Sequence, residues 1–180
     1  MPDANITKSA LALSMKRLMS EKPFSKISVI SICQGCGMNR KSFYYHFKDK
    51  YDLVNWIFYT DFINLVSEGS FESGWDLMAA VAELFYADQA FYCSAMKIEG
   101  QNSFHDYFQE SMTPIVGFFI RDLLESEENI HEDEGEFLIS FFCDAYLTVT
   151  LQWLERGCQV PPKEFIDKIK TVIRTFAANA

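Results

Sequence analysis

The segment Ile27–Lys50, with the sequence ISVISICQGCGMNRKSFYYHFKDK, constrains the fold of this chain more than any other stretch. It predicts a short helix, a tight turn and a second short helix. Ser28 is a typical N-cap residue for the first helix, and Asn39 is one for the second. Gly37 lies between them and can adopt the positive φ that a sharp corner between helices requires. The segment therefore predicts a helix-turn-helix unit.

The apolar spacing separates an inner side of this unit from an outer one. Ile30 and Cys33 form a narrow buried edge on the first helix, and Phe43 and Phe47 lie four apart and point inward. The remaining side chains of the second helix are polar or aromatic: Arg40, Lys41, Ser42, Tyr44, Tyr45 and His46. Two cations at a helix start are unfavourable for the macrodipole. They are explained if this end faces a polyanion, as a recognition helix does in the DNA major groove.

The charge distribution divides the chain into two parts. The whole chain has a formal net charge of −9, which taken alone argues against nucleic-acid binding. Residues 1–50 hold nine Lys and Arg against three acids, a net charge of +6, whereas residues 51–180 have a net charge of −15. A solvated charged face would explain scattered charges but not this partition. The pattern indicates a basic module that meets phosphates and an acidic module that does not.

Residues from Ile6 to about Leu53 resemble the DNA-binding domain of the TetR/AcrR family of transcriptional regulators. The resemblance is carried by an amphipathic opening helix that ends in EKPF, followed by SVISICQGCGMNRKSFYYHFKDKYDL. The spacing typical of the family is supplied by Tyr44, Phe47, Lys50 and Leu53. Met38, Asn39 and the basic pair Arg40–Lys41 depart from the usual pattern. The resemblance implies an N-terminal three-helix DNA-binding domain, a helical ligand or dimerisation domain, and a homodimer on a palindromic double-stranded operator.

The expected roles of the DNA-facing residues follow from their positions. Arg40 and Lys41 lead the recognition helix, where base edges are reached, and an arginine can pair bidentately with guanine. Tyr45 could contact a base or a phosphate. Both Tyr44 and Tyr45 could instead be half-buried packing residues. The resemblance implies backbone contacts at Tyr44, His46 and Lys50, with Lys26 or Ser28 at the start of the first helix. The predicted set is Lys26, Ser28, Asn39, Arg40, Lys41, Ser42, Tyr44, Tyr45, His46 and Lys50.

The rest of the chain reads as helical, and signals for β-strands are absent. We expect an all-α fold of about nine helices, with a DNA-binding domain at 1–50 and a regulatory and dimerisation domain at 51–180. Predicted helices cover Thr7–Lys22, Asp49–Val66, Trp75–Phe91, Tyr92–Glu99, Ser103–Leu124 with an interruption near Pro114, Glu136–Arg156, and a last helix after Pro161-Pro162. Lys16, Arg17 and Lys22 lie off the apolar stripe of the opening helix, on a surface that could approach DNA. Glu125–Gly135 predicts an exposed charged connector.

Aromatic side chains are concentrated in the second part of the chain. The family resemblance permits a small-molecule pocket there, lined by Trp56, Tyr59, Phe62, Phe85, Tyr86, Tyr92, Met96, His105, Phe108 and Phe119. Aromatic stripes at helical spacing are equally typical of an ordinary core, and His105 fits a surface or capping position as well as a ligand contact. Both interpretations stay open.

The helix expected at Glu136–Arg156 is apolar on more than one side, beyond what the core of one protomer should absorb. In the TetR family the last two helices pack against their two-fold mates as a four-helix bundle. The expected dimer interface comprises Phe137, Phe141, Ala145, Val149, Trp153, Phe165, Ile169, Val172 and Phe176.

Five cysteines, an odd number, favour a reducing cytoplasm. Cys33 and Cys36 form a CxxC pair, but the pair closes a helix and no strand precedes it, so core and turn packing is favoured over redox sensing. No second CxxC or histidine pair accompanies it, and we expect neither a metal nor a cofactor.

No leader and no apolar run of about eighteen residues is apparent, so we expect no membrane partner.

We weigh three classes of function: a DNA-binding regulator, a helical enzyme and a protein-binding adaptor. A helical enzyme is disfavoured because no carboxylate pair, Ser/His/Asp set or phosphate loop occurs at a meaningful spacing. An adaptor whose helix-turn-helix no longer engages DNA stays open, although its basic residues speak against it.

The stretches YDLVNWIFYTDF and FYCSAMKIEGQNSFHDYF are similar to the TetR-family subgroup that regulates dihydroxyacetone kinase operons. That similarity implies an activator whose signal comes from a protein partner instead of a small ligand.

Overall fold

The computed structural model describes the backbone of residues 2–100, 103–125 and 132–177. Within these ranges the chain forms nine α-helices, one 3-10 turn and no strand, which confirms the all-α prediction. The elements are α1 (Pro2–Glu21), η1 (Phe24–Lys26), α2 (Val29–Gly35), α3 (Arg40–His46), α4 (Lys50–Glu68), α5 (Gly74–Ala87), α6 (Gln89–Ala95), α7 (Phe104–Glu125), α8 (Glu132–Glu155) and α9 (Pro162–Ala177).

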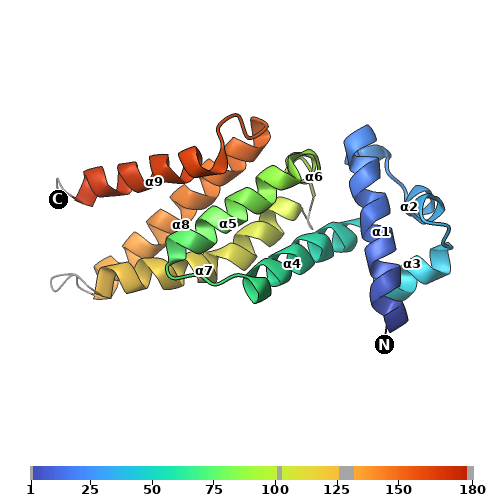
Figure 1. The fold of residues 1–180 in the computed structure, drawn as a ribbon, viewed down its shortest axis with the longest axis horizontal. Coiled ribbons are helices and arrows are strands. Elements are labelled where there is room, and N and C mark those ends of the chain that lie inside the picture. Colours follow the sequence, from blue (N-terminus) through green and yellow to red (C-terminus); the bar gives the residue numbers. More distant parts are fainter. Residues whose placement is uncertain (1, 101–102, 126–131, 178–180) are drawn as a thin grey trace.

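The helices form two groups, which we call the head (α1 to α3) and the body (α5 to α9) (Figure 1). α4 runs from the head into the body. α1 lies between the body on one side and α2 and α3 on the other, and it contacts both α4 and α6. The recognition helix predicted from the sequence is therefore held at the outer end of the molecule, far from the C-terminus.

The head has a small apolar core that α1 completes. Leu11 and Met15, the stripe predicted for the opening helix, are fully buried, and so is Phe43 on α3. Ile30 does not form the inner edge of α2, as the sequence predicted, but is exposed. Ile32 takes that place because α2 begins at Val29 and turns positions 32 and 33 toward α1.

α4 joins the head to the body. Asp49 caps it, since its Oδ1 accepts hydrogen bonds from the backbone N–H groups of Tyr51 and Asp52 at 2.8 and 2.9 Å. Farther along the same helix, Phe58 is almost completely buried among aromatic rings of the body. Its ring centroid lies 5.4 Å from that of Phe104 and 5.6 Å from that of Phe108.

Several predicted helices differ from those observed, beginning with α1, which starts at Pro2 instead of Thr7. The helix expected to reach Phe91 ends at Ala87, because the chain breaks at Asp88 before α6. α7 continues through Pro114 without the predicted interruption. Pro114 is exposed, so water can satisfy the carbonyl that the missing N–H leaves unbonded. The charged connector is shorter than expected, because α8 begins at Glu132; residues 126–131 lie outside the described part of the chain.

We predict that Phe58→Ala lowers the free energy of unfolding by about 3–5 kcal/mol, because it leaves a cavity between α4, α5 and α7. Urea denaturation at a fixed protein concentration measures this change. Tyr45→Ala, at a highly exposed aromatic of α3, is the matched control and should change stability by about 0.5 kcal/mol or less. Equal losses in the two variants would contradict the packing described here.

Candidate nucleic-acid interface

The turn between α2 and α3 is built from local hydrogen bonds. Ser28 caps α2 by accepting a hydrogen bond from the backbone N–H of Ser31 at 3.1 Å, and the Ser31 hydroxyl oxygen accepts one from the N–H of Ser28. Gly37 has φ 69°, in the left-handed region predicted for it, and the N–H of Met38 returns to the carbonyl of Cys33 at 2.8 Å. These bonds fix the angle between the two short helices.

Asn39 caps α3 as predicted. Its Oδ1 accepts a hydrogen bond from the backbone N–H of Ser42 at 2.9 Å. Phe43 and Phe47 hold the inner side of the helix in the core of the head. The outer side is thereby set by the covalent geometry of α3, because side chains adjacent to the buried pair must point away from it.

The outer side of α3 is cationic and aromatic. Arg40 and Lys41 are exposed at its first turn, and no acidic residue occurs there. Tyr45 is 83% exposed and Tyr44 is 51% exposed, so neither is packed in the core, although the packing alternative had been open. The Arg40 guanidinium lies 5.7 Å from the centre of the Tyr44 ring, and the ring of His46 is half-buried beside Tyr45. Lys26, Ser28 and Asn39 are also exposed, and Ser42 is half-buried.

Lys50 has a different environment from the open phosphate ligand that the sequence predicted. Its ammonium donates hydrogen bonds to the carbonyls of Phe24 and Ile27 at 2.8 and 2.9 Å, and lies 4.2 Å from the centre of the Phe24 ring. Burial lowers the pKa of the Lys50 side chain. Lys50 therefore holds η1 in place at the entrance to α2, and its role as a phosphate contact stays a prediction.

The CxxC pair is engaged in packing. Cys33 is buried and Cys36 is half-buried, and each thiol donates to a backbone carbonyl at 3.5 Å. Burial raises the pKa of both thiols, which lowers the thiolate fraction that redox chemistry requires. Among the described residues, no group of three or more His, Cys, Asp and Glu side chains could hold a metal ion.

The structure does not bring the ten predicted pocket residues together. Phe85, Tyr92, Met96 and Phe108 are buried in the body, and Phe62 is half-buried beside them. The others lie elsewhere: Trp56 packs on Phe47 of the head, Tyr59 and Tyr86 are exposed, His105 pairs with Asp106, and the side chain of Phe119 lies outside those described. The buried ring of Phe85 contacts two of the others, with its centroid 4.7 Å from that of Tyr92 and 5.4 Å from that of Phe108. A ligand there would have to displace these rings, and the pocket stays a prediction.

The predicted dimer residues separate into two groups. Phe137, Phe141, Ala145 and Val149 recur every fourth residue of α8 and are all exposed, so they form one apolar stripe, which we call the α8 face. Val172 is exposed on α9, Ile169 is half-buried, and the side chain of Phe176 lies outside those described. Trp153 and Phe165 differ from the prediction, because they are buried in the protomer itself and stack on each other at 4.7 Å.

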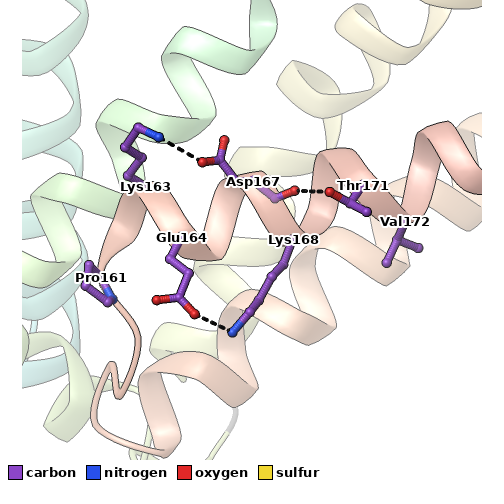
Figure 2. A pocket seen from close by; sticks show the side chains of 7 residues that line it. All are labelled: Pro161, Lys163, Glu164, Asp167, Lys168, Thr171 and Val172. Carbon is purple, nitrogen blue, oxygen red and sulfur yellow. Dashed lines mark hydrogen bonds and ion pairs between the residues drawn. The ribbon is translucent and has the colours of Figure 1, made fainter.

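A surface groove of about 780 Å³ runs along α9 next to Val172 (Figure 2). Two ion pairs line it, Lys163–Asp167 at 3.0 Å and Glu164–Lys168 at 2.7 Å, each between residues four apart. Such exposed pairs within one helix contribute little to stability. The four charged residues that line the groove are all in these two ion pairs. The described lining therefore has no unpaired charge that would select a ligand.

One described segment, Glu136–Glu155, is long and apolar enough by composition to span a membrane, contrary to the expectation from the sequence. The segment belongs to α8, which contacts α6 and α7, and 39% of its most apolar window is buried in the protein. We therefore assign it as a core helix with one open face.

Lys16 corrects another expectation. It was placed on the surface that could approach DNA, but its ammonium is turned inward and pairs with the carboxylates of Asp61 and Asp88, each at 2.9 Å. The sequence offered no signal for these pairs, because the three residues are separated by at least 27 positions and belong to different helices or their caps.

Comparisons with known proteins agree with this geometry. Residues 16–57 match the family described as bacterial regulatory proteins, tetR family, and residues 75–175 match its transcriptional regulator C-terminal region. The second match alone covers more than half of the chain. The chain therefore belongs to the TetR family of transcriptional regulators, as the resemblance in its sequence implied.

Individual relatives are regulators as well. The chain is 26% identical over 154 residues to the HTH-type dhaKLM operon transcriptional activator DhaS of Lactococcus lactis subsp. lactis (strain IL1403), covering 84% of this chain and 81% of that protein. A solved structure of the dihydroxyacetone kinase operon activator DhaS is similar with a TM-score of 0.74 and 22% identity, covering 94% and 95% of the two chains. NalD, the secondary repressor of the MexAB-OprM efflux pump in Pseudomonas aeruginosa, gives a TM-score of 0.70 at 17% identity, covering 95% and 96%. None of these relatives is described as an enzyme.

We predict that Asn39→Ala lowers the free energy of unfolding by about 1 kcal/mol, because the first turn of α3 loses its cap. Asn39→Asp should keep nearly the wild-type stability, since a carboxylate accepts the same hydrogen bond and favours the helix N-terminus. Chemical denaturation of the three proteins provides the measurement. A loss in the Asp variant as large as in the Ala variant would show that the cap is not the source of the effect.

Proposed function

We propose that this protein is a sequence-specific regulator that binds a palindromic double-stranded DNA operator as a homodimer. The observation that carries the proposal is the outer side of α3, where Arg40, Lys41, Tyr44 and Tyr45 project from a capped helix at the end of the molecule. Arginine and lysine at a leading helix turn can reach base edges, and tyrosine hydroxyls can reach phosphates.

The charge partition supports the same orientation on DNA. Residues 1–50 form the basic DNA-binding domain of our proposal, and residues 51–180 form the acidic regulatory and dimerisation domain. The negative charge of the body would be repelled by phosphates, so that the molecule approaches the duplex head first. α4 begins at this boundary.

The α8 face supports the homodimer. Phe137 and Phe141 are 70% and 57% exposed, with their ring centroids 6.5 Å apart, and a stripe of this kind is typical of an interface. A two-fold contact through α8, assisted by Val172 and Ile169 on α9, would give each dimer two recognition helices. Heads related by a two-fold axis read half-sites about 34–36 Å apart, which is why the operator would be palindromic.

The acidic body would receive the regulatory signal. We propose that a small ligand or a protein partner changes the affinity for DNA through residues 51–180. The relatedness to an activator of the dhaKLM operon favours activation. The tightly packed rings of Phe85, Tyr92 and Phe108 favour a protein partner over a pre-formed ligand cavity. We also propose a cytoplasmic location, where five free cysteines remain reduced.

A second candidate function is a helix-turn-helix adaptor that signals through a partner without binding DNA. The exposed aromatics Tyr44 and Tyr45 favour it, since aromatic residues are common at the centre of protein interfaces. A duplex selected from a randomised pool would decide between the two functions. A regulator enriches a palindrome, whereas an adaptor enriches no sequence.

We predict that Arg40→Ala reduces discrimination at one base pair of each half-site by about 1–3 kcal/mol, because a base contact is lost. Tyr44→Phe removes only a hydroxyl and should weaken binding to all duplexes by a similar factor, because a phosphate contact carries no sequence information. Affinities for the selected duplex and its single-base variants measure both effects. Identical profiles for the two variants would contradict these roles.

We predict that Phe141→Asp converts the dimer into a monomer at micromolar concentration, because it places a charge in the apolar interface. Tyr59→Asp is the matched control, since Tyr59 is 52% exposed on α4, away from the α8 face, and should leave the dimer intact. Sedimentation of both variants provides the measurement. A dimer that persists in Phe141→Asp would place the interface elsewhere.

A further inference from the structure

A small polar network joins the head to the body, and we call it the latch: Lys16, Asp61, Asp88 and Tyr92. The ammonium of Lys16 on α1 bonds both carboxylates at 2.9 Å. Asp61 lies on α4, and Asp88 lies at the break between α5 and α6. The Tyr92 hydroxyl on α6 donates to Asp61 Oδ2 at 2.8 Å. One cation of the head therefore connects two separate segments beyond it.

The charged groups of the latch are partly shielded from water, which strengthens the interactions between them. The side chains of Lys16 and Asp61 are each 25% exposed, and the ammonium also lies 5.2 Å from the centre of the buried Phe91 ring. Burial alone would lower the pKa of Lys16, but the two carboxylates outweigh it, and the pKa is raised. Without the lysine, the carboxylates of Asp61 and Asp88 would lose the cation that they share in this partly buried space, and Asp61 would keep its bond from the Tyr92 hydroxyl.

Tyr92 ties the latch to the aromatic core of the body. Its side chain is fully buried, and its ring lies 4.7 Å from Phe85 and 6.5 Å from Phe58. Burial and the neighbouring Asp61 raise the pKa of the Tyr92 hydroxyl, so it stays a hydrogen-bond donor at neutral pH. A displacement of these rings would move the Tyr92 hydroxyl, which donates to Asp61. Asp61 in turn pairs with Lys16 on α1 of the head.

The surroundings of the latch contain few other polar contacts. The Ser94 hydroxyl on α6 reaches the carbonyl of Met19 on α1 at 3.3 Å, and the remaining contact between these helices is largely apolar. Apolar contacts tolerate sliding of one helix along another. The three bonds of the latch are directional and do not: the Lys16 ammonium makes two, and the Tyr92 hydroxyl makes one. The latch therefore adds directed bonds that restrict the angle at which α1 packs on the body.

We propose that Lys16, Asp61, Asp88 and Tyr92 are positioning residues that fix the angle between the head and the body, and thereby the spacing of half-sites that the dimer accepts. This inference rests on the proposed function. A head held at one angle presents α3 at one distance from its two-fold mate. A head released from the latch adapts to several distances, and binding then has to order it, which weakens binding to the best site.

The test uses the full-length protein and the duplex that it selects from a randomised pool, together with versions whose central spacer is one base pair longer or shorter. The wild type should bind the altered spacers about tenfold or more weakly. Lys16→Met and Asp61→Asn should each weaken binding to the selected duplex and bring the three spacers to within about twofold of one another. Lys16→Arg, which can still reach both carboxylates, should keep the wild-type spacing preference.

The paired substitutions separate the latch from long-range charge effects. Removing a cation should weaken DNA binding and removing an anion should strengthen it, if only net charge mattered. The latch instead predicts weaker binding in both, and the double variant Lys16→Met/Asp61→Asn should match each single variant within about twofold. Lys97→Met is the charge control, because Lys97 is exposed and makes no side-chain bond within the described residues. It should keep the spacing preference.

Two outcomes would overturn the proposal. The latch is refuted if folded, dimeric Lys16→Met and Asp61→Asn proteins discriminate spacers as the wild type does. Asp61→Asn is nearly isosteric and keeps an acceptor for Tyr92, so it should remain folded even where Lys16→Met does not. A wild type that selects no duplex would overturn the proposed function, and this inference with it, which distinguishes the two failures.

Discussion

One continuous hydrophobic cluster passes from the head to the body through α4 and holds the two together. Leu53 and Ile57 are buried at its start, and Phe58 is buried among the rings of the body. α1 closes the cluster from the other side with Leu11 and Met15. A large reorientation of the head would expose this apolar surface, at a cost of about 25 cal/mol for each Å². The position of α3 is thus a property of the whole chain.

Two surfaces are left open by this packing, and they differ in chemistry. The outer side of α3 is cationic and aromatic, and the α8 face is apolar. The proposed function gives each surface a partner of matching chemistry, a polyanion for the first and an apolar surface for the second. Membership of the TetR family fits both surfaces, because regulators of this family bind operator DNA and act as dimers.

Local features could be predicted well from the sequence, because short-range physics decides them. The caps at Ser28, Asn39 and Asp49 and the positive φ of Gly37 depend on residues within a few positions of each other. The boundaries at Asp88 and Pro114 could not be predicted in the same way. At Asp88, packing in the body ends a strong helical pattern, and at Pro114 it outweighs the preference of proline to interrupt a helix.

The all-α fold, the helix-turn-helix and the charge partition follow from the amino-acid sequence alone, since each depends on residue types at fixed spacing. Which apolar residues remain exposed depends on how the helices pack in three dimensions. This packing buries Trp153 and Phe165 against each other, leaves Phe137 and Phe141 open, and turns Lys16 inward. The physical reason is that burial and ion pairing depend on partners from distant helices, and no local pattern records which partners those are.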